Sequence, residues 1–307
     1  MEILFTIIGG LVALLALAAL VVILHLWKHA RLRHRTLFDR QTLFHGSGLF
    51  HVASAVKLKS GEDLLSGIGR LVKEIERQGA KVIYAGKVAF PRTRISRQVP
   101  DLEWDAYVIA QYSSRRAWDS MVESQAYNDL LDDFTRVWPL GFERSAVQNV
   151  AVTMMMLRLR IRHLLSRAPP TYPFEPQDLP EDGLPPVAMD KAALDRAVAE
   201  YEPLSRDALV IVNFQKQGNA EQSRRNDRYG ASMMSMLAEV GYGPIHLGRA
   251  VSLEDDVDFD QVAIISYPGI RYFAEMVRSK FYTGIFGGKQ LSDDLTAPTV
   301  PILQHLK

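Results

Sequence analysis

Hydrophobic and polar positions follow the same pattern twice along this chain. Residues 104–127 read as a buried strand, a short turn and an amphipathic helix, and residues 259–282 read the same way. The two segments align without a gap, 155 residues apart. Their identical pairs include Asp105 with Asp260, Tyr112 with Tyr267, Ser124 with Ser279 and Tyr127 with Tyr282. The pattern therefore indicates an internal duplication.

The first copy is expected to hold the element order β-α-β-β-α-β. Alternation predicts strands near residues 51–58, 81–90, 104–112 and 147–152. Apolar residues spaced by three and four predict helices near 62–77 and 115–123. This order is typical of a ferredoxin-like fold, in which one antiparallel sheet carries both helices on one face.

The second copy repeats these elements, with strands expected near 208–214 and 243–251 and a helix near 228–240. Gly79 and Gly241 follow the first helix of each copy at an offset of 162 residues, so the second copy has lost seven residues before Phe259. Pro298 and Pro301 flank the last strand, which indicates an edge position.

The amino-terminal segment is apolar for long enough to cross a membrane. Residues 3–27 are interrupted only by His25, and as a helix they extend about 37 Å against a hydrocarbon core of about 30 Å. The basic residues that flank the segment all follow it: Lys28, Arg31, Arg33, Arg35 and Arg40. By the positive-inside rule, we expect a single-pass protein of the inner (cytoplasmic) membrane with its amino terminus outside and the bulk of the chain in the cytosol.

The segment between the copies has three parts. Residues 153–167 form a basic amphipathic pattern that favours a helix, although residues 157–162 also alternate as a strand would. Such a helix either lies on anionic headgroups or packs on its own domain. A proline-rich linker at 168–187 and a short helix from Asp190 follow. The predicted organisation is an anchor (1–27), a basic juxtamembrane segment (28–48), a first domain (49–152), a connector (153–200) and a second domain (201–307).

Composition excludes several kinds of chemistry. The 307 residues are 48% hydrophobic, which is ample for two cores. The formal net charge is +1, so the chain has no overall field for nucleic acid, and no nucleic-acid partner is expected. There is no cysteine, which excludes disulfides, thiolate zinc sites and cysteine nucleophiles.

Two short motifs carry a resemblance to a known family. The residues Gln111-Tyr112-Ser113-Ser114 and Ser124-Gln125-Ala126-Tyr127 resemble the signature of a bacterial family of small dimeric α+β barrels, domain of unknown function 1330. This resemblance implies that two ferredoxin-like domains, present here as a tandem repeat, close one barrel as an intrachain pseudo-dimer.

The chain also departs from that family at polar positions. Gln111 and Ser266 stand where the family commonly has a carboxylate, and Phe134 and Lys289 stand in the register of its arginine. An amide or a hydroxyl cannot act as the base that a carboxylate could be. The departures therefore argue against acid-base chemistry inherited from relatives.

Candidate ligand-binding residues are the polar aromatics Tyr84, Tyr112, His246 and Tyr267. His246 replaces Tyr84 at the same position of the other copy, so the two are expected to face each other across a barrel and line a pocket. Neither His51 nor His246, the two histidines within the folded copies, has a second ligand at metal spacing, and the sequence predicts no catalytic set, no cofactor and no metal site.

Two functional classes follow from these features. The first is a membrane-anchored, non-catalytic binding or assembly module, whose partner is a membrane protein or a small apolar ligand. The alternative is a cofactor-independent, monooxygenase-like enzyme on a small apolar substrate, which rests on analogy with proteins that share the barrel. A barrel interior that holds a cavity of some hundreds of cubic ångströms favours a ligand or substrate, and a filled interior argues against the enzyme.

Overall fold

The structure is a computed structural model that describes residues 2–37, 49–90, 96, 98–99, 103–166, 169–177, 191–206, 208–254 and 257–306. Parts of two predicted segments lie outside these residues. They are the basic juxtamembrane segment after residue 37 and the proline-rich linker at residue 168 and from residue 178 onward.

Among its described residues, the first half of the chain has four strands and three helices after the long helix α1 (Glu2–Leu37). They follow in the order β1 (Phe50–Leu58), α2 (Leu64–Arg77), β2 (Lys81–Val88), β3 (Ala106–Tyr112), α3 (Arg115–Val122), α4 (Gln125–Leu131) and β4 (Phe134–Arg144). Two helices then connect the halves, α5 (Ala146–Leu165) and α6 (Lys191–Tyr201).

The second half repeats this order. It consists of β5 (Leu209–Lys216), α7 (Ala220–Val240), β6 (Gly243–Val251), β7 (Gln261–Tyr267), α8 (Ile270–Val277), α9 (Lys280–Phe286) and β8 (Asp293–Pro301), with a short 3-10 helix at Leu303–His305. The first three strands of each half and helix α2 lie close to their predicted positions, and these predictions are confirmed. Helix α7 ends where predicted but begins at Ala220 instead of residue 228.

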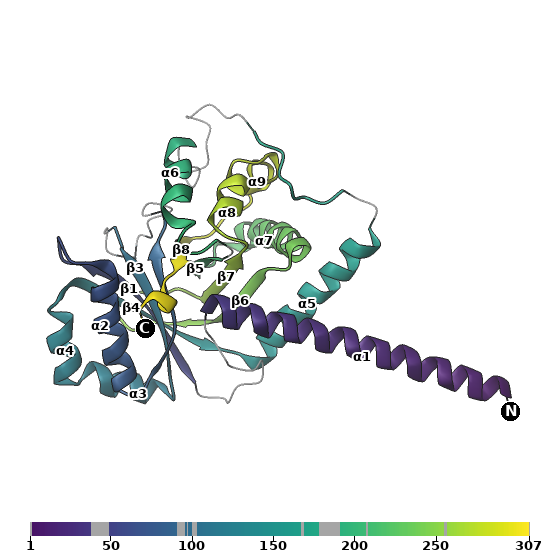
Figure 1. Cartoon of the computed structure of the whole chain (residues 1–307), viewed down its shortest axis with the longest axis horizontal. Helices are drawn as coiled ribbons and strands as arrows, with labels where there is room; N and C mark the ends of the chain where they lie inside the picture. Colours follow the sequence, from purple (N-terminus) through teal and green to yellow (C-terminus); the bar gives the residue numbers. More distant parts are fainter. Residues whose placement is uncertain are drawn as a thin grey trace.

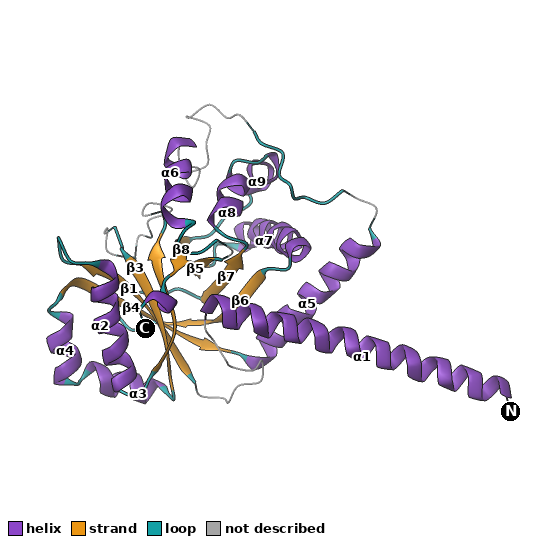
Figure 2. Ribbon diagram, in the orientation of Figure 1, coloured by secondary structure: helices purple, strands orange, loops and turns teal. Residues whose placement is uncertain are grey.

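The eight strands close one antiparallel barrel in the order β1-β3-β2-β8-β5-β7-β6-β4. Within each half the last strand lies beside the first, so the halves have the orders β4-β1-β3-β2 and β8-β5-β7-β6. The halves meet where β2 pairs with β8 and where β4 pairs with β6. As Figure 1 and Figure 2 show, α2, α3 and α4 cover one side of the barrel, and α7, α8 and α9 cover another.

The barrel interior is filled by side chains. Trp104, Trp138, Phe142 and Phe214 belong to one buried cluster that also takes in the inward-facing aliphatic residues of both halves. Two further clusters lie between the outer face of the barrel and the helices of each half. Since alternate residues along each strand point inward and outward, every strand contributes to the interior and to one of the outer layers.

The two halves share local irregularities as well as strand order. Gly79 and Gly241, which follow α2 and α7, both adopt φ 85°, a left-handed conformation that glycine accommodates without a Cβ clash. In the strand that follows each helix, the pairing register shifts at the same place, between Val82 and Tyr84 in β2 and between Pro244 and His246 in β6. Tyr84 and His246 are therefore equivalent positions, as the sequence predicts.

Two local predictions need correction. Residues 147–152, expected to be the last strand of the first half, belong to helix α5, and the strand is β4 (Phe134–Arg144). Ser145 caps helix α5: its hydroxyl accepts from the Gln148 amide at 3.3 Å. This cap favours a helix over the strand that the short alternation of residues 147–152 predicted. The same helix excludes a strand at 157–162. Pro298 and Pro301 do not lie at an edge, because β8 pairs with both β5 and β2.

Helix α1 projects from the barrel on the side of α5 (Figure 1). Within the described residues, Phe5–Leu32 is long and apolar enough to cross a membrane. Most of its side chains are exposed, whereas His25 is buried against α5, where its Nε2 lies 2.8 Å from the Thr153 carbonyl oxygen. The carboxyl-terminal end of α1 is therefore fixed to the barrel.

Candidate functional site

A cavity of about 380 Å³ lies in the second half, between the outer face of β5, β7 and β8 and the helices α7, α8 and α9. Its helix side is formed by Tyr229, Gly230, Met233 and Met234 of α7. Its volume falls within the range of small-molecule sites, and its wall is mainly apolar with a few polar groups.

The helix side of the cavity opens because α7 carries small or polar residues where α2 carries large apolar ones. At the offset that matches the two helix-ending glycines, Gly230 corresponds to Ile68 and Asn226 corresponds to Leu64. Ile68 is fully buried in the first half, whereas a Cβ added to Gly230 meets nothing within 4 Å. The same layer is therefore packed in the first half and hollow in the second.

The sheet side of the cavity is polar for a related reason. The cross-strand pair Val56 and Ala106 of the first half corresponds to Gln215 and Gln261 of the second, and the Gln261 amide donates to Gln215 Oε1 at 2.7 Å. Asn213 likewise takes the place of Ser54, as the paired strands show. These replacements give the cavity a hydrogen-bonding floor.

A buried ion pair lies at this floor. Lys289, which lines the cavity, places its Nζ 2.7 Å from Asp294 Oδ2, and the two side chains are 8% and 2% exposed. The ammonium group also donates to Thr296 Oγ1 at 3.0 Å, and that oxygen lies 3.0 Å from Asn213 Oδ1. Lys289 lines the cavity and Asp294 is not among the lining residues, so the cavity meets the cation and not the carboxylate. Such an arrangement stabilises negative charge on a bound oxygen.

Three tyrosines share the cavity with this ion pair. Tyr229, Tyr267 and Tyr282 all line it. Burial raises the pKa of Tyr267 and of Tyr282 well above the usual value, and neighbouring Tyr229 raises both further. Both hydroxyls are therefore neutral and able to donate hydrogen bonds at physiological pH. Asp227, on the exposed side of α7, is a carboxylate that also lines the cavity.

The four residues predicted from sequence lie in three different places. Tyr267 lines the cavity just described. Tyr112 lies in the corresponding layer of the first half, where its ring packs edge-on against Trp118 at 5.3 Å. Tyr84 and His246 lie inside the barrel.

The two interior positions contact different residues. The Tyr84 hydroxyl lies 2.6 Å from Thr299 Oγ1, and the His246 ring lies 5.9 Å from the ring of His51. His51 in turn stacks on Phe142 at 5.0 Å. The expected cavity inside the barrel is therefore not found among the described residues, and the filled interior argues against an enzyme that binds its substrate there. The cavity that the structure does contain lies outside the barrel, in a helix-covered layer. Within the described residues, no group of three or more His, Asp or Glu side chains is placed to hold a metal ion.

Several solved structures are similar to this chain. A mutant chlorite dismutase from Candidatus Nitrospira defluvii has a TM-score of 0.44 at 11% identity, over 87% of this chain and 98% of that one. A dye-decolorizing protein from V. cholerae has a TM-score of 0.42 at 13% identity, over 86% and 97%. An anthrone oxidase-like protein has a TM-score of 0.40 at 8% identity, over 84% and 92%. No family model matches the chain, and no curated protein matches it.

These names contradict the main functional expectation. A non-catalytic binding or assembly module was inferred from the missing carboxylates at Gln111 and Ser266, whereas structurally similar proteins are named as a chlorite dismutase, a dye-decolorizing protein and an anthrone oxidase-like protein. That expectation is wrong, and the alternative, an enzyme, becomes the function proposed below. Similarity at these TM-scores carries no argument about the activity of this chain, so the enzyme is argued from its own cavity.

Proposed function

We propose that the protein is a cofactor-independent, monooxygenase-like enzyme that acts on a small apolar substrate bound in the cavity under α7. The observation that carries the proposal is a cation, Lys289, buried at the floor of a cavity that is otherwise mainly apolar. Burying an ion pair costs free energy because both charges lose their hydration. Lys289 can offset this cost by stabilising a substrate that has an apolar body and one oxygen that becomes negative in the reaction.

The proposed roles follow from the chemistry of the lining. The apolar body of the substrate packs on Met233, Phe273 and Met276, which are buried residues at the cavity wall. The substrate oxygen accepts from Lys289 and from a tyrosine hydroxyl, for which Tyr267 is the sequence-derived candidate. Asp227 supplies the carboxylate that removes a proton, a role that the uncharged Gln111 and Ser266 cannot fill.

The reaction class that fits is oxygenation of an ionised carbon by dioxygen. Proton removal from a CH₂ group beside a carbonyl gives a carbanion whose charge rests largely on the carbonyl oxygen, where Lys289 stabilises it. One atom of dioxygen then becomes the new carbonyl oxygen, and the other leaves with the two substrate hydrogens as water. The substrate itself supplies the electrons that reduce dioxygen, so no separate reductant is required.

Oxygen uptake tests this proposal directly. Purified full-length protein in mild detergent is mixed with anthrone, which carries one acidic CH₂ group on an apolar ring system, and dioxygen consumption is followed with an electrode. We expect consumption to stop at one dioxygen per anthrone, and Lys289→Met to lower kcat by about 100-fold or more, as loss of an oxyanion-stabilising donor does. Anthrone that binds without any protein-dependent oxygen uptake overturns the oxygenase.

We also infer that α1 anchors the chain in the cytoplasmic membrane as a single span, with the barrel in the cytosol. The apolar span and the exposed basic residues Lys28 and Arg31 directly after it support this orientation. An apolar substrate concentrates in the bilayer, so an anchored enzyme meets it at the membrane surface.

The two halves are further inferred to be a tandem repeat that closes as an intrachain pseudo-dimer of domains 49–152 and 201–307. Equal strand orders, the matched register shifts in β2 and β6 and the matched glycines support this history. The resemblance to domain of unknown function 1330 belongs to the same proposal. On this view one half has kept a cavity and the other has filled it.

A further inference from the structure

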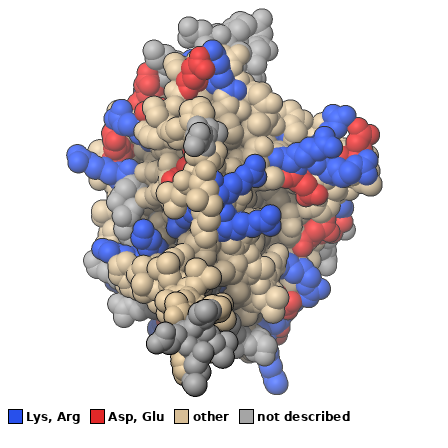
Figure 3. All heavy atoms as spheres, turned by 90° about the vertical axis from the view of Figure 1, so that its right-hand side faces the viewer, with Lys and Arg blue, Asp and Glu red and all other residues tan. Residues whose placement is uncertain are grey.

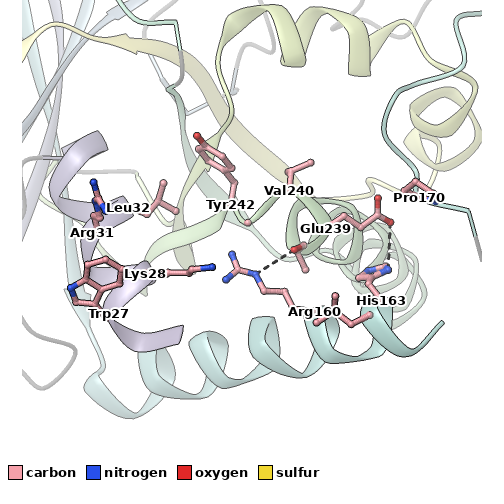
Figure 4. A pocket seen from close by; sticks show the side chains of 13 residues that line it. Trp27, Lys28, Arg31, Leu32, Arg160, His163, Pro170, Glu239, Val240 and Tyr242 are labelled. Atoms are coloured by element: carbon pink, nitrogen blue, oxygen red, sulfur yellow. Dashed lines mark hydrogen bonds and ion pairs between the residues drawn. The ribbon is translucent and has the colours of Figure 1, made fainter. Parts of the chain in front are cut away.

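A second cavity, of about 750 Å³, lies where the end of α1 meets the barrel. Figure 4 shows its three walls: Trp27, Lys28 and Arg31 come from α1, Arg160 and His163 from α5, and Glu239 from the end of α7. It shares no lining residue with the cavity beneath α7 that faces the sheet.

The charges that meet in this cavity are mainly positive. The Lys28 side chain extends toward the Arg160 guanidinium in Figure 4, and both charges act on the same neighbour, His25. Two cations that converge on one space repel each other unless an anion lies between them. The described ion pairs include no carboxylate that pairs with Lys28 or Arg160.

Arg160 is held in place by neutral acceptors. Its Nε donates to the Ala238 carbonyl oxygen at 3.3 Å, at the carboxyl-terminal end of α7, and its Nη1 lies 3.2 Å from His25 Nδ1. Burial lowers the pKa of this guanidinium from its usual value. The contacts fix the position of Arg160, but none of them neutralises its charge.

The one carboxylate of the cavity is already engaged. Glu239 accepts from the Thr171 amide and from the Thr171 hydroxyl, both at 2.8 Å. Its Oε1 also lies 3.6 Å from His163 Nδ1 (Figure 4). With Glu239 turned to these partners, Lys28, Arg31 and Arg160 leave the cavity with an excess of positive charge.

The cavity lies at the level where a membrane surface is expected. The bond from His25 to Thr153 fixes α1 on the barrel, so the bilayer must end before residue 25. Residues 5–24 then provide about 30 Å of apolar helix, the thickness of a hydrocarbon core. Trp27 is 56% exposed and stacks with Arg31 at 5.5 Å, as aromatic and basic residues do at the headgroup level.

Apolar side chains border the same opening. Leu164, which lines the cavity, is 85% exposed and Leu165 is 80% exposed at the end of α5. Figure 3 views the molecule from the side to which α1 projects, and Lys and Arg side chains lie across the middle of this face, while Asp and Glu lie mainly toward its upper and right-hand margins. A cationic hollow beside exposed leucines matches a ligand with an anionic head and acyl chains.

We propose that this cavity binds the phosphate headgroup of an anionic membrane phospholipid, held between Lys28 on α1 and Arg160 on α5. The acyl chains run along α1 and past Leu164 into the bilayer. Bound lipid then joins the anchor to the barrel and fixes the orientation of the enzyme on the membrane. This inference depends on the proposed anchoring, and it is independent of the proposed reaction.

Native mass spectrometry and thermal unfolding of the full chain in detergent test the proposal. Phosphatidylglycerol, phosphatidylcholine and inorganic phosphate are added separately. We expect one phosphatidylglycerol to stay bound per chain and to raise Tm, phosphatidylcholine to do neither, and inorganic phosphate at the same concentration to leave Tm unchanged. Lys28→Gln and Arg160→Gln should each weaken the retention of phosphatidylglycerol about fivefold, the share of one basic residue near an anionic surface.

Arg158→Gln is the matched control, because Arg158 is exposed on the same helix and does not line the cavity. It should retain phosphatidylglycerol as the natural chain does. Lys28→Gln keeps the test valid if Arg160→Gln unfolds, since Lys28 is exposed and makes no described hydrogen bond. Equal retention of both lipids, unchanged retention in Lys28→Gln, or stabilisation by inorganic phosphate alone overturns a phospholipid site.

Discussion

Gly230 on α7 occupies the position that Ile68 occupies on α2, and this one replacement separates a hollow layer from a packed one. Ile68 is fully buried against the first half of the sheet. A Cβ added to Gly230 would have no other atom within 4 Å. The two halves thus offer an internal comparison, in which the chain itself contains the filled version of its own cavity.

Gly230→Ile should close the cavity while leaving the fold intact. The new side chain enters open space, and glycine in a helix interior costs about 1 kcal/mol relative to alanine, so stability should rise or stay constant. Binding of anthrone, measured by quenching of intrinsic fluorescence, should fall at least tenfold, since the side chain occupies the volume of the ligand.

Gly69→Ile provides the control, because Gly69 is the helical neighbour of Ile68 on α2 and also has open space for a Cβ. It should leave anthrone binding unchanged. If Gly230→Ile binds anthrone as well as the natural chain does, the ligand lies elsewhere and the assigned site is wrong.

The Lys289 and Asp294 pair should be sensitive to the loss of either partner. Asp294→Asn leaves a lysine that is 8% exposed without its counter-charge, and breaking a buried pair in this way costs about 3–5 kcal/mol. The double variant Lys289→Met and Asp294→Leu removes both charges and should unfold at a higher urea concentration than Asp294→Asn alone. Urea unfolding followed by circular dichroism checks both. Equal midpoints for the two variants would show that desolvated charge is not the cause.

Much of the fold could be predicted from the repeated pattern. The apolar runs that end at Tyr112 and Tyr267 arise because these strands are buried on both faces, and such runs can be recognised in the local sequence. The last strand of the first half was missed because β4 contains Pro139 and is followed by Ser145, which caps α5. Pro298 lies in a strand that is paired on both sides because the barrel closes. The closure depends on contacts between residues far apart in the sequence, which the local composition around Pro298 does not reveal.

The candidate site was only partly predictable. Tyr267 was a candidate because its pattern repeats, whereas Lys289 was noted only as a departure from the resembled family and was not assigned to a site. The decisive residue, Gly230, carries no functional group. It can be recognised only by aligning the two copies at the 162-residue offset of Gly79 and Gly241. In that alignment the large side chain of Ile68 is replaced by a glycine, which has no side chain. Interior positions such as Tyr84 were expected to line a pocket, and aromatic side chains from both halves fill that space instead.

The contact of His25 with Thr153 should determine whether α1 moves independently of the barrel. His25→Leu keeps the helix apolar but removes the bond to the Thr153 carbonyl and the contact with Arg160. The chain has no cysteine, so spin labels can be attached at Leu24→Cys and Met155→Cys without a background. The distance between the labels should broaden in His25→Leu and stay narrow in His34→Leu, which changes an exposed histidine of the same helix. Equal distributions would mean that other contacts hold α1.

Substitution by phenylalanine should have opposite effects on stability at two tyrosines inside the barrel. The Tyr107 hydroxyl is buried and has no hydrogen-bond partner among the described residues, so Tyr107→Phe should stabilise the fold by about 1–3 kcal/mol. The Tyr84 hydroxyl lies 2.6 Å from Thr299 Oγ1, so Tyr84→Phe should destabilise it by about 1 kcal/mol. Urea midpoints measured side by side decide this. A loss of stability in Tyr107→Phe would show that a water or another group satisfies its hydroxyl.

Alkaline pH should unfold the protein through its buried tyrosines. Burial raises the folded-state pKa of Tyr84, Tyr107, Tyr112, Tyr127, Tyr267 and Tyr282 above the ordinary value near 10.0. Above that pH the unfolded chain loses phenolic protons that the folded chain keeps. Stability is therefore fully present below about pH 10 and falls as pH rises, by about 1.4 kcal/mol per pH unit for each such tyrosine.

Urea unfolding between about pH 9 and 11, with phenolate absorbance recorded in parallel, measures this dependence. Tyr107→Phe should reduce the slope by the share of one tyrosine, because one proton fewer is released on unfolding. The six buried phenols should show no phenolate absorbance until the fold is lost. Phenolate formation by all the tyrosines in the still-folded protein would mean that the layers around the barrel admit water and hydroxide. In that case the cavity beneath α7 could not exclude water from a carbanion.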